Sequence, residues 1–189
     1  MRENIHLPTA KITPMLIAYI CAGIIALVLL AGLLAPRDMG LAKTMRIAAP
    51  RDQVWPRISN LRELDRWNPW SAKDPNIEQQ FTGTDGQVGS QMHWQSKVRG
   101  VGQGRQEITA LTPHERVDMD IEFIQPRTGI AKSAVTMTGE DGAVDVTWSF
   151  QSKMPYPFNA LMLVINFEKV MDKDFTEGLA HLKALCEAE

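Results

Sequence analysis

The chain has 189 residues, a formal net charge of −2 and a hydrophobic fraction of 44%. This composition is typical of a folded globular protein and excludes a disordered or collagen-like chain. Residues 1–43 hold four of the 20 Lys and Arg residues and two of the 22 Asp and Glu residues, so the remainder carries 16 basic and 20 acidic side chains. This acidic surplus argues against a nucleic-acid-binding surface, which needs clustered positive charge.

An apolar run without a single charge covers residues 15–35, "MLIAYICAGIIALVLLAGLLA". At about 1.5 Å per residue, a helix of this length spans about 30 Å, the thickness of the hydrocarbon core of a bilayer. Pro14 and Pro36 bracket the run, as prolines do at helix ends. We therefore predict a transmembrane helix over residues 15–35.

Two other interpretations of this run compete with a membrane anchor. A cleaved signal peptide has an apolar core of roughly 7–15 residues and an A-x-A cleavage pattern, and the sequence before Pro36 lacks that pattern. A buried core helix needs apolar surroundings on all sides, which one small domain rarely provides. Basic residues lie on both sides of the run, at Arg2 and Lys11 before it and at Arg37, Lys43 and Arg46 after it, so the orientation stays open.

The predicted organisation follows from this anchor. An N-terminal tail covers residues 1–14, the transmembrane helix 15–35, a linker 36–43 and one domain 44–187. We expect a single-pass membrane protein, with the side on which the domain lies left open.

The domain begins with a strand and two short helices. Residues 43–48 alternate between apolar and polar side chains, which predicts a strand. The segments "RDQVWPRISN" and "LRELDRW" predict helices, and Pro69 disfavours a helical residue at Asn68, so the chain turns there. Trp67 and Trp70 flank this turn. We predict that Trp67 packs inward to seal the core, and the alternative is that the tryptophans line the entrance of a cavity.

The remainder predicts six strands and one long helix. The strands cover 77–82, 89–98, 103–112, 115–125, 129–139 and 143–152, several of them separated by glycine-containing turns. Alternating apolar and polar residues predict a curved antiparallel sheet with one dry face. The helix covers about 157–186, with an apolar stripe formed by Val164, Phe167, Met171, Phe175, Leu179, Leu182 and Leu185. Gly178 lies in this stripe and permits close approach.

Packing of these elements predicts an α+β fold. The long helix lies across the dry face of the sheet, and the first strand pairs with the last. Trp148 and Phe175 are expected to face each other across the gap between sheet and helix.

Three stretches carry a resemblance to a known family: "IAAPRDQVWPRISNLRELDRWNPWSAKDPN", "GVGQGRQEITALTPHERVDMDIEFIQP" and "MDKDFTEGLAHLKALCE". Over about residues 44–187 the chain resembles the START-like SRPBCC superfamily, in its polyketide cyclase/dehydrase and lipid-transport branch. The resemblance implies a helix-grip fold, in which about seven antiparallel strands grip a long C-terminal helix. It also implies a cavity between sheet and helix for a hydrophobic or amphipathic small molecule. Function varies widely within such a fold.

The candidate ligand-binding residues are those expected to point into this cavity. They are Trp67, Trp94, Gln106, Ile108, Met119, Ile121, Val135, Met137, Trp148, Met171 and Phe175. Gln106 and Ser133 are the polar side chains expected on the inward face. They either bond each other or water, or fix the polar end of a ligand.

No set of residues predicts catalysis, a metal site or a cofactor. The sequence has no G-x-S-x-G motif, and Cys21 and Cys186 form no C-x-x-C pair. His93 alternates with apolar neighbours and is expected to face solvent. Residues 100–104, "GVGQG", join two strands and precede no helix, so they predict a hairpin and not a phosphate-binding loop.

Three functions remain open. The first is a membrane-anchored binding protein for a hydrophobic small molecule or lipid, with no nucleic-acid partner and with protein partners left open. The second is a cyclase or hydratase that acts through Glu107 or His93. The third is a protein-interaction module similar to activators of chaperone ATPases, which predicts a large exposed apolar patch.

The run "LMLVINF" at 161–167 is either covered by loops or forms a lip that touches the membrane.

Overall fold

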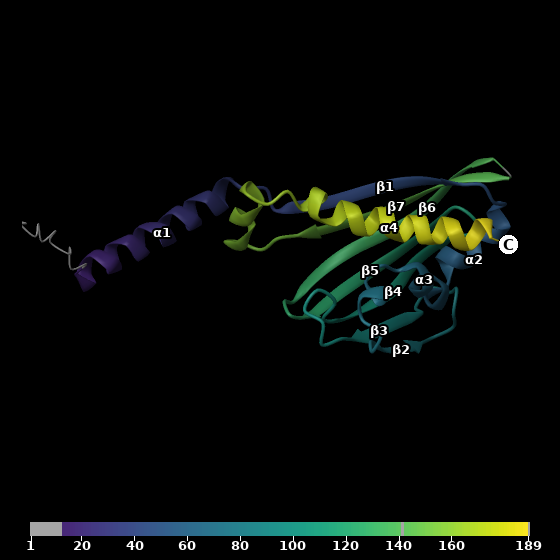
Figure 1. Ribbon diagram of the computed structural model, residues 1–189, viewed down its shortest axis with the longest axis horizontal. Helices are drawn as coiled ribbons and strands as arrows, with labels where there is room; N and C mark the ends of the chain where they lie inside the picture. The colour runs from purple at the N-terminus through teal and green to yellow at the C-terminus, as the bar shows by residue number, and fades with distance from the viewer. Residues whose placement is uncertain (1–12, 141, 189) are drawn as a thin grey trace, which may run out of the picture.

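The computed structural model describes residues 13–140 and 142–188. Residues 1–12 of the expected N-terminal tail lie outside this part. Figure 1 shows one long helix leading away from a domain in which a sheet is covered by helices on one face.

The helices and strands follow the predicted order. They are α1 (Pro14–Leu34), β1 (Asp38–Ile47), α2 (Arg51–Ser59), α3 (Leu61–Trp67), the 3₁₀ helix η1 (Ser71–Lys73), β2 (Glu78–Thr82), β3 (Gln91–Gln95), β4 (Gln103–Thr112), β5 (Arg116–Gln125), β6 (Gly129–Glu140), β7 (Ala143–Lys153), the 3₁₀ helix η2 (Phe158–Leu163) and α4 (Phe167–Glu187).

The strands form one antiparallel sheet in the order β1-β7-β6-β5-β4-β3-β2. The predicted pairing of the first and last strands is confirmed, since Leu41 pairs with Phe150 and Ile47 with Val144. The sheet curves around α4, which lies across its inner face (Figure 1). The predicted helix-grip α+β fold is therefore confirmed, with seven strands.

Two boundaries differ from those predicted. Most of the segment 36–43, expected to be a linker, belongs to β1, because its residues pair with the end of β7 from Asp38 onward. The long helix begins at Phe167 and not near Pro157. The side chain of Asn166 accepts a hydrogen bond from the backbone N–H of Lys169 (2.9 Å), which caps the helix there. Val164, expected in the apolar stripe, is 81% exposed.

The core fills only one end of the space between sheet and α4. Val117 and Met119 of β5 are buried, whereas Ile121 and Phe123, on the same face of the same strand, are only half-buried. On α4, Leu179 and Leu182 are buried, and residues nearer the start of the helix are progressively less so. One end of the domain is thus solidly packed, and the other end, beside α1, is not.

The corner around Trp67 closes the middle of the core. Trp67 is fully buried, and its indole N–H donates to the carbonyl of Arg57 (2.9 Å). Its ring meets that of Trp148 edge-on, with 5.0 Å between the ring centres. Gly178 makes room for this corner, since a Cβ there would lie 2.9 Å from the Trp148 ring and 3.0 Å from Pro69 Cδ.

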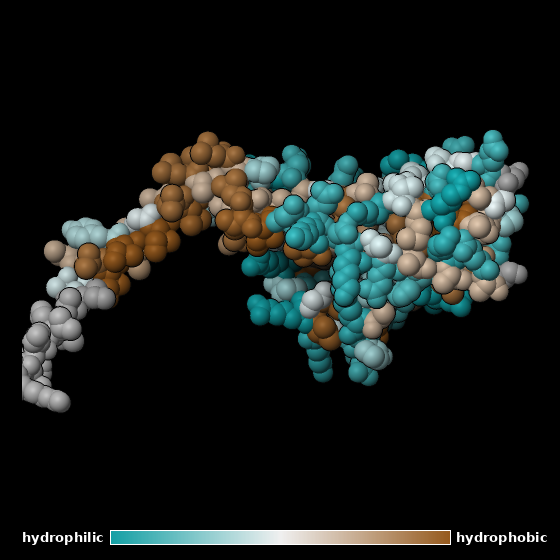
Figure 2. Space-filling view, turned by 45° about the horizontal axis from the view of Figure 1, so that its top comes forward, coloured by the Kyte–Doolittle hydropathy of each residue, from teal (hydrophilic) through white to brown (hydrophobic). Residues whose placement is uncertain are grey.

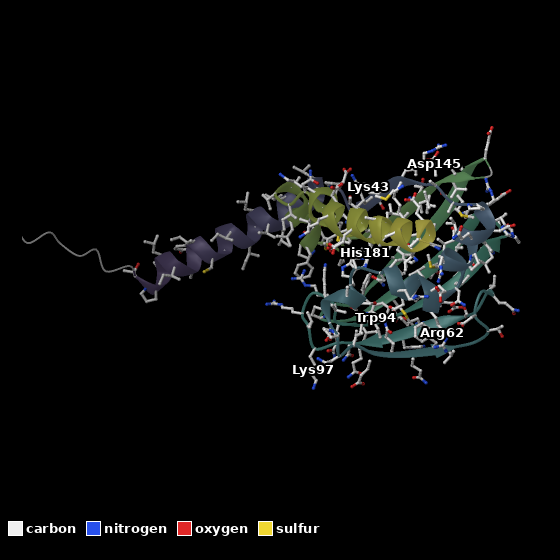
Figure 3. The ribbon with its side chains drawn as sticks, turned by 45° about the vertical axis from the view of Figure 1, so that its right-hand side comes forward. Lys43, Arg62, Trp94, Lys97, Asp145 and His181 are labelled. Atoms are coloured by element: carbon white, nitrogen blue, oxygen red, sulfur yellow. The ribbon has the colours of Figure 1, made fainter. Side chains whose placement is uncertain are left out.

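An ion pair near its start and a hydrogen bond at its end hold α4 in place. Lys43 of β1, labelled in Figure 3, pairs with Asp172. The hydrogen bond to this carboxylate is the main cause of the raised pKa of Lys43. At the far end, Glu187 accepts from Lys183 Nζ (2.6 Å) and from the backbone N–H of Ala48 (2.6 Å), so its pKa is lowered. The contacts of Lys43 and Ala48 fix the helix against β1 and the residue that follows it, whereas the Lys183–Glu187 pair lies within α4.

The C-terminal end of α1 docks on η2. Asn159 Nδ2 donates to the carbonyls of Gly32 (2.7 Å) and Ala35 (3.0 Å), and the Tyr156 hydroxyl donates to the carbonyl of Leu29 (3.3 Å). The two bonds from Asn159 satisfy carbonyls that the end of a helix leaves without intrahelical partners. Gly32 permits the contact, because a Cβ there would lie 3.0 Å from the Tyr156 ring.

Outside this docking site α1 is exposed. Of its residues only Gly32 is buried, so α1 is not a core helix of this domain. It is long and apolar enough to cross a membrane.

Candidate ligand-binding cavity

A cavity of about 800 Å³ lies where the packed core ends. Its walls come from the inner face of β3 to β7, from α4, and from the corner between α3 and η1. The volume is within the range of about 300–1,000 Å³ that is usual for small-molecule sites.

Buried side chains form the deep end of the cavity. They are Met92, Gln106, Ser133, Trp148, Phe150 and Phe175. Trp148 and Phe175 stack with 4.3 Å between their ring centres and an interplanar angle of 27°. The predicted meeting of these two residues is confirmed, and their rings form an apolar end wall.

The polar groups at the deep end already have partners. The Ser133 hydroxyl donates to the carbonyl of Ser149 (3.0 Å) and accepts from the indole N–H of Trp148 (3.0 Å). Gln106 Nε2 donates to the sulfur of Met119 (2.7 Å). Ser133 therefore orients Trp148, and the deep end is mainly apolar.

Exposed side chains form the mouth of the cavity. Apart from Ile124 near the end of β5, they belong to the connection between β5 and β6 and to the segment after β7, and they include Pro126, Arg127, Thr128, Pro155 and Phe158. Both segments lie at the end of the domain on which α1 docks (Figure 1). Figure 2 shows that the hydrophobic surface of α1 continues onto the adjoining part of the domain.

Six of the eleven predicted site residues line this cavity. They are Trp94, Gln106, Ile121, Trp148, Met171 and Phe175. Trp94 lies between the sheet and the helices in Figure 3, whereas Lys97, two residues after the end of β3, points away from the domain. The indole N–H of Trp94 donates to the carbonyl of Val101 (3.3 Å), and Val101 also lines the cavity.

The other five predicted residues lie in the packed core and do not line the cavity. They are Trp67, Ile108, Met119, Val135 and Met137, each no more than 3% exposed. They point to the same side as the six that do. They lie nearer the packed end, or behind the first layer of side chains.

Several lining residues were missed. Phe123, Phe150 and Phe167 each share a face with a predicted residue, so strand alternation and helix spacing contain the signal that would have found them. Trp70 lies in the turn between α3 and η1, where neither pattern applies. Arg127 and Phe158 lie in irregular segments, where no periodicity gives a direction.

The residues proposed for catalysis lie outside the cavity. His93 has a ring nitrogen 3.4 Å from Gln91 Oε1, and Glu107 accepts from Gln91 Nε2 (2.9 Å); neither lines the cavity. Among the described lining residues there is no carboxylate and no imidazole. The described residues also contain no group of His, Cys, Asp and Glu that could hold a metal ion.

A buried carboxylate supports one wall from outside. Asp74 accepts hydrogen bonds from the Ser96 hydroxyl and from the backbone N–H of Asn76 (2.9 Å), and these bonds lower its pKa. These bonds join the loop after η1 to the residue that follows β3. Each of the two joined segments is adjacent to a lining residue, Ser71 on the first and Trp94 on the second.

A family model described as polyketide cyclase/dehydrase and lipid transport matches residues 40–187. The chain belongs to this family. No curated protein matches this chain in sequence. Its membership indicates a domain that binds a hydrophobic ligand or acts as a cyclase or dehydrase.

Solved structures confirm the fold of this family member. It is similar to the major latex-like protein 151 of Panax ginseng (15% identity, 80% of this chain and 99% of that one, TM-score 0.57). It is also similar to proteins from Chromobacterium violaceum (18% identity, 80% and 98%, TM-score 0.54) and Rhizobium loti (15% identity, 78% and 96%, TM-score 0.57). At these identities the likeness establishes the fold alone.

Proposed function

We propose that this protein is a membrane-anchored binding protein for a hydrophobic or amphipathic small molecule. One observation carries the proposal. An apolar cavity of about 800 Å³ has its mouth at the end of the domain on which the apolar helix α1 docks. A ligand that partitions into a bilayer is therefore concentrated where the cavity opens.

The surface beside the mouth supports an approach from the membrane. Phe158, Leu163, Val164, Ile165 and Val170 are between 46% and 81% exposed and form an apolar lip next to the end of α1. Exposed apolar side chains in one place mark an interaction surface. Because this lip adjoins a helix that is long enough to span a bilayer, we assign it to the membrane and not to a protein partner.

A cyclase or hydratase acting in the same cavity is the second candidate, and the family description favours it. Such an enzyme needs a general acid or base within hydrogen-bonding reach of its substrate. Since Glu107 and His93 lie outside the cavity, binding explains the described lining better than acid–base chemistry does.

Native mass spectrometry of the full-length protein, extracted in a mild detergent, tests the proposal. We expect a co-purified apolar or amphipathic molecule bound at one per chain. The proposal fails if the protein carries no such molecule and also takes up none when apolar compounds are added.

A further inference from the structure

The charged side chains that line the cavity are both basic. Among the described lining residues, Arg127 and Lys153 are the ones with a formal charge, and all the others are apolar or neutral. Both lie at the mouth. Arg127 follows the end of β5 by two residues, and Lys153 is the last residue of β7.

Neither charge is neutralised by a strong ion pair. The guanidinium carbon of Arg127 lies 5.9 Å from the ring centre of Phe158, and no described carboxylate pairs with it. Lys153 Nζ lies 3.5 Å from Asp38 Oδ1, and both side chains are about four-fifths exposed. Such an exposed pair contributes little and exchanges readily with another anion.

Aromatic side chains and a further basic residue lie around this end of the domain. Arg37, just after α1, lies 6.0 Å from the ring centre of Tyr156, and Phe158 belongs to the apolar lip. Basic residues mixed with aromatic ones are typical of the level where lipid head groups meet the hydrocarbon core. The mouth therefore combines an apolar opening with positive charge at its rim.

We propose that the ligand is an amphiphile with a single anionic head group. It binds with its apolar chain against Trp148 and Phe175 and its head group on Arg127 and Lys153. This inference rests on the proposed binding function and adds the chemical class and the orientation of the ligand. Guanidinium and ammonium groups form charge-assisted hydrogen bonds with carboxylates and phosphates.

The reverse orientation is unfavourable. At the deep end no described lining residue carries a charge, and the Ser133 hydroxyl is occupied by Trp148 and Ser149. An anion placed there loses its hydration without gaining a countercharge, which disfavours this orientation. In the proposed orientation the head group of the ligand stays at the surface, while its apolar chain moves from the bilayer into the cavity.

Tryptophan fluorescence tests this orientation directly. All five tryptophans lie after α1, and Trp70, Trp94 and Trp148 line the cavity. Bromine atoms quench tryptophan at short range, so 9,10-dibromostearate reports on chains that reach these residues. Its methyl ester has the same chain without the charge. The full-length protein in a neutral detergent is titrated with each probe, at a pH where the carboxylate is ionised.

We expect the acid to quench at about tenfold lower concentration than the ester, as one or two charge-assisted hydrogen bonds allow. Arg127→Gln with Lys153→Gln should remove this preference and leave quenching by the ester unchanged. Lys132→Gln is the matched control, because Lys132 is exposed on β6, pairs with Asp120 and does not line the cavity.

The outcomes separate the two proposals. If the acid and the ester quench equally in the parent protein, or if the double variant retains the preference, the anionic head group is refuted while cavity binding stands. If neither probe quenches, the proposed binding function fails and this inference fails with it. The thermal midpoints of the double variant and of Lys132→Gln, compared with that of the parent protein, report whether each variant is folded. We expect both to be folded, because Arg127 and Lys153 are exposed.

Discussion

Phe175 of α4 stacks on Trp148 of β7, and this contact joins the helix to the sheet at the boundary between core and cavity. Removing one of the two rings opens the cavity into the core. Because truncating a buried Phe to Ala costs about 3–5 kcal/mol, Phe175→Ala should lower the thermal midpoint strongly. Lys173→Ala, on the exposed side of the same helix, is the control. Equal small effects of the two changes in thermal denaturation would contradict this role of the stacked pair.

Gly178→Ala should destabilise the protein although the residue lies inside a helix. Replacing Gly by Ala in a helix normally stabilises it by about 1 kcal/mol. Here the new methyl group would lie 2.9 Å from the Trp148 ring and 3.4 Å from the Trp67 carbonyl, and the Trp67 ring and the hydrogen bond to Ser133 hold Trp148 in place. We expect an overpacking cost of about 1–3 kcal/mol in denaturant unfolding. Glu177→Ala, one residue earlier on the exposed face, should have little effect, and a stabilised Gly178→Ala variant would refute the tight contact.

The hydrogen bonds of Asp74 predict a dependence of stability on pH. Its pKa in the folded state is lowered from the ordinary value of 3.8, mainly by the Ser96 hydroxyl. A lowered pKa means that the folded state favours the ionised form. The stabilisation is therefore complete above pH 3.8 and is lost as the pH falls through the lower folded value.

Asp74→Asn should accordingly have a lower thermal midpoint than the parent protein at neutral pH. The difference between the two midpoints should shrink as the pH is lowered below 3.8. A difference that stays constant from neutral to acidic pH would show that the ionised carboxylate does not contribute.

Filling the cavity should prevent ligand binding without unfolding the domain. Ile121 lines the cavity and is half-buried, so Ile121→Trp places a larger side chain in the space the ligand needs. Ile130 of the neighbouring strand is 71% exposed and does not line the cavity, so Ile130→Trp is the matched control. Native mass spectrometry should find the co-purified molecule with the control and not with Ile121→Trp. Equal occupancy in both variants would place the ligand elsewhere.

The apolar lip should bind membranes without α1. The fragment 36–189 retains the whole of β1, which begins at Asp38. We expect it to co-sediment with vesicles of phosphatidylcholine and phosphatidylglycerol. Changing Val164 and Ile165 together to Glu should abolish this binding, whereas Val88→Glu, at an exposed valine far from the lip in sequence, should not. If the fragment and both variants bind equally, or none binds, the lip does not contact the bilayer.

Sequence periodicity predicted the faces of the strands but not the depth of their residues. Met119 and Ile121 are two apart on β5 and point to the same side, yet the first is in the core and the second lines the cavity. The difference depends on how far α4 and the Trp67 corner reach along the sheet. That distance is set by contacts between segments far apart in the chain, which a local pattern does not contain.

The start of α4 shows a second limit. The apolar residues of 161–166 fit a helical pattern, but the cap at Asn166 and the docking of Asn159 on α1 fix this segment as a separate 3₁₀ helix and turn. A side-chain hydrogen bond to another element competes with helix propagation, and propensity alone does not reveal it. The predicted order of elements and the meeting of Trp148 and Phe175 were confirmed, because they follow from long alternating or helical patterns.

Only three residues, Ala35, Pro36 and Arg37, separate the end of α1 from the start of β1. Even fully extended, three residues reach about 11 Å, and Asn159 clamps the end of α1 to the domain as well. The domain is therefore held against the end of α1, without a flexible linker between them. With α1 in a membrane as proposed, a connection this short does not let the domain reach a second membrane. Under the proposed binding function, the ligand would therefore enter and leave the cavity beside the one membrane that α1 spans.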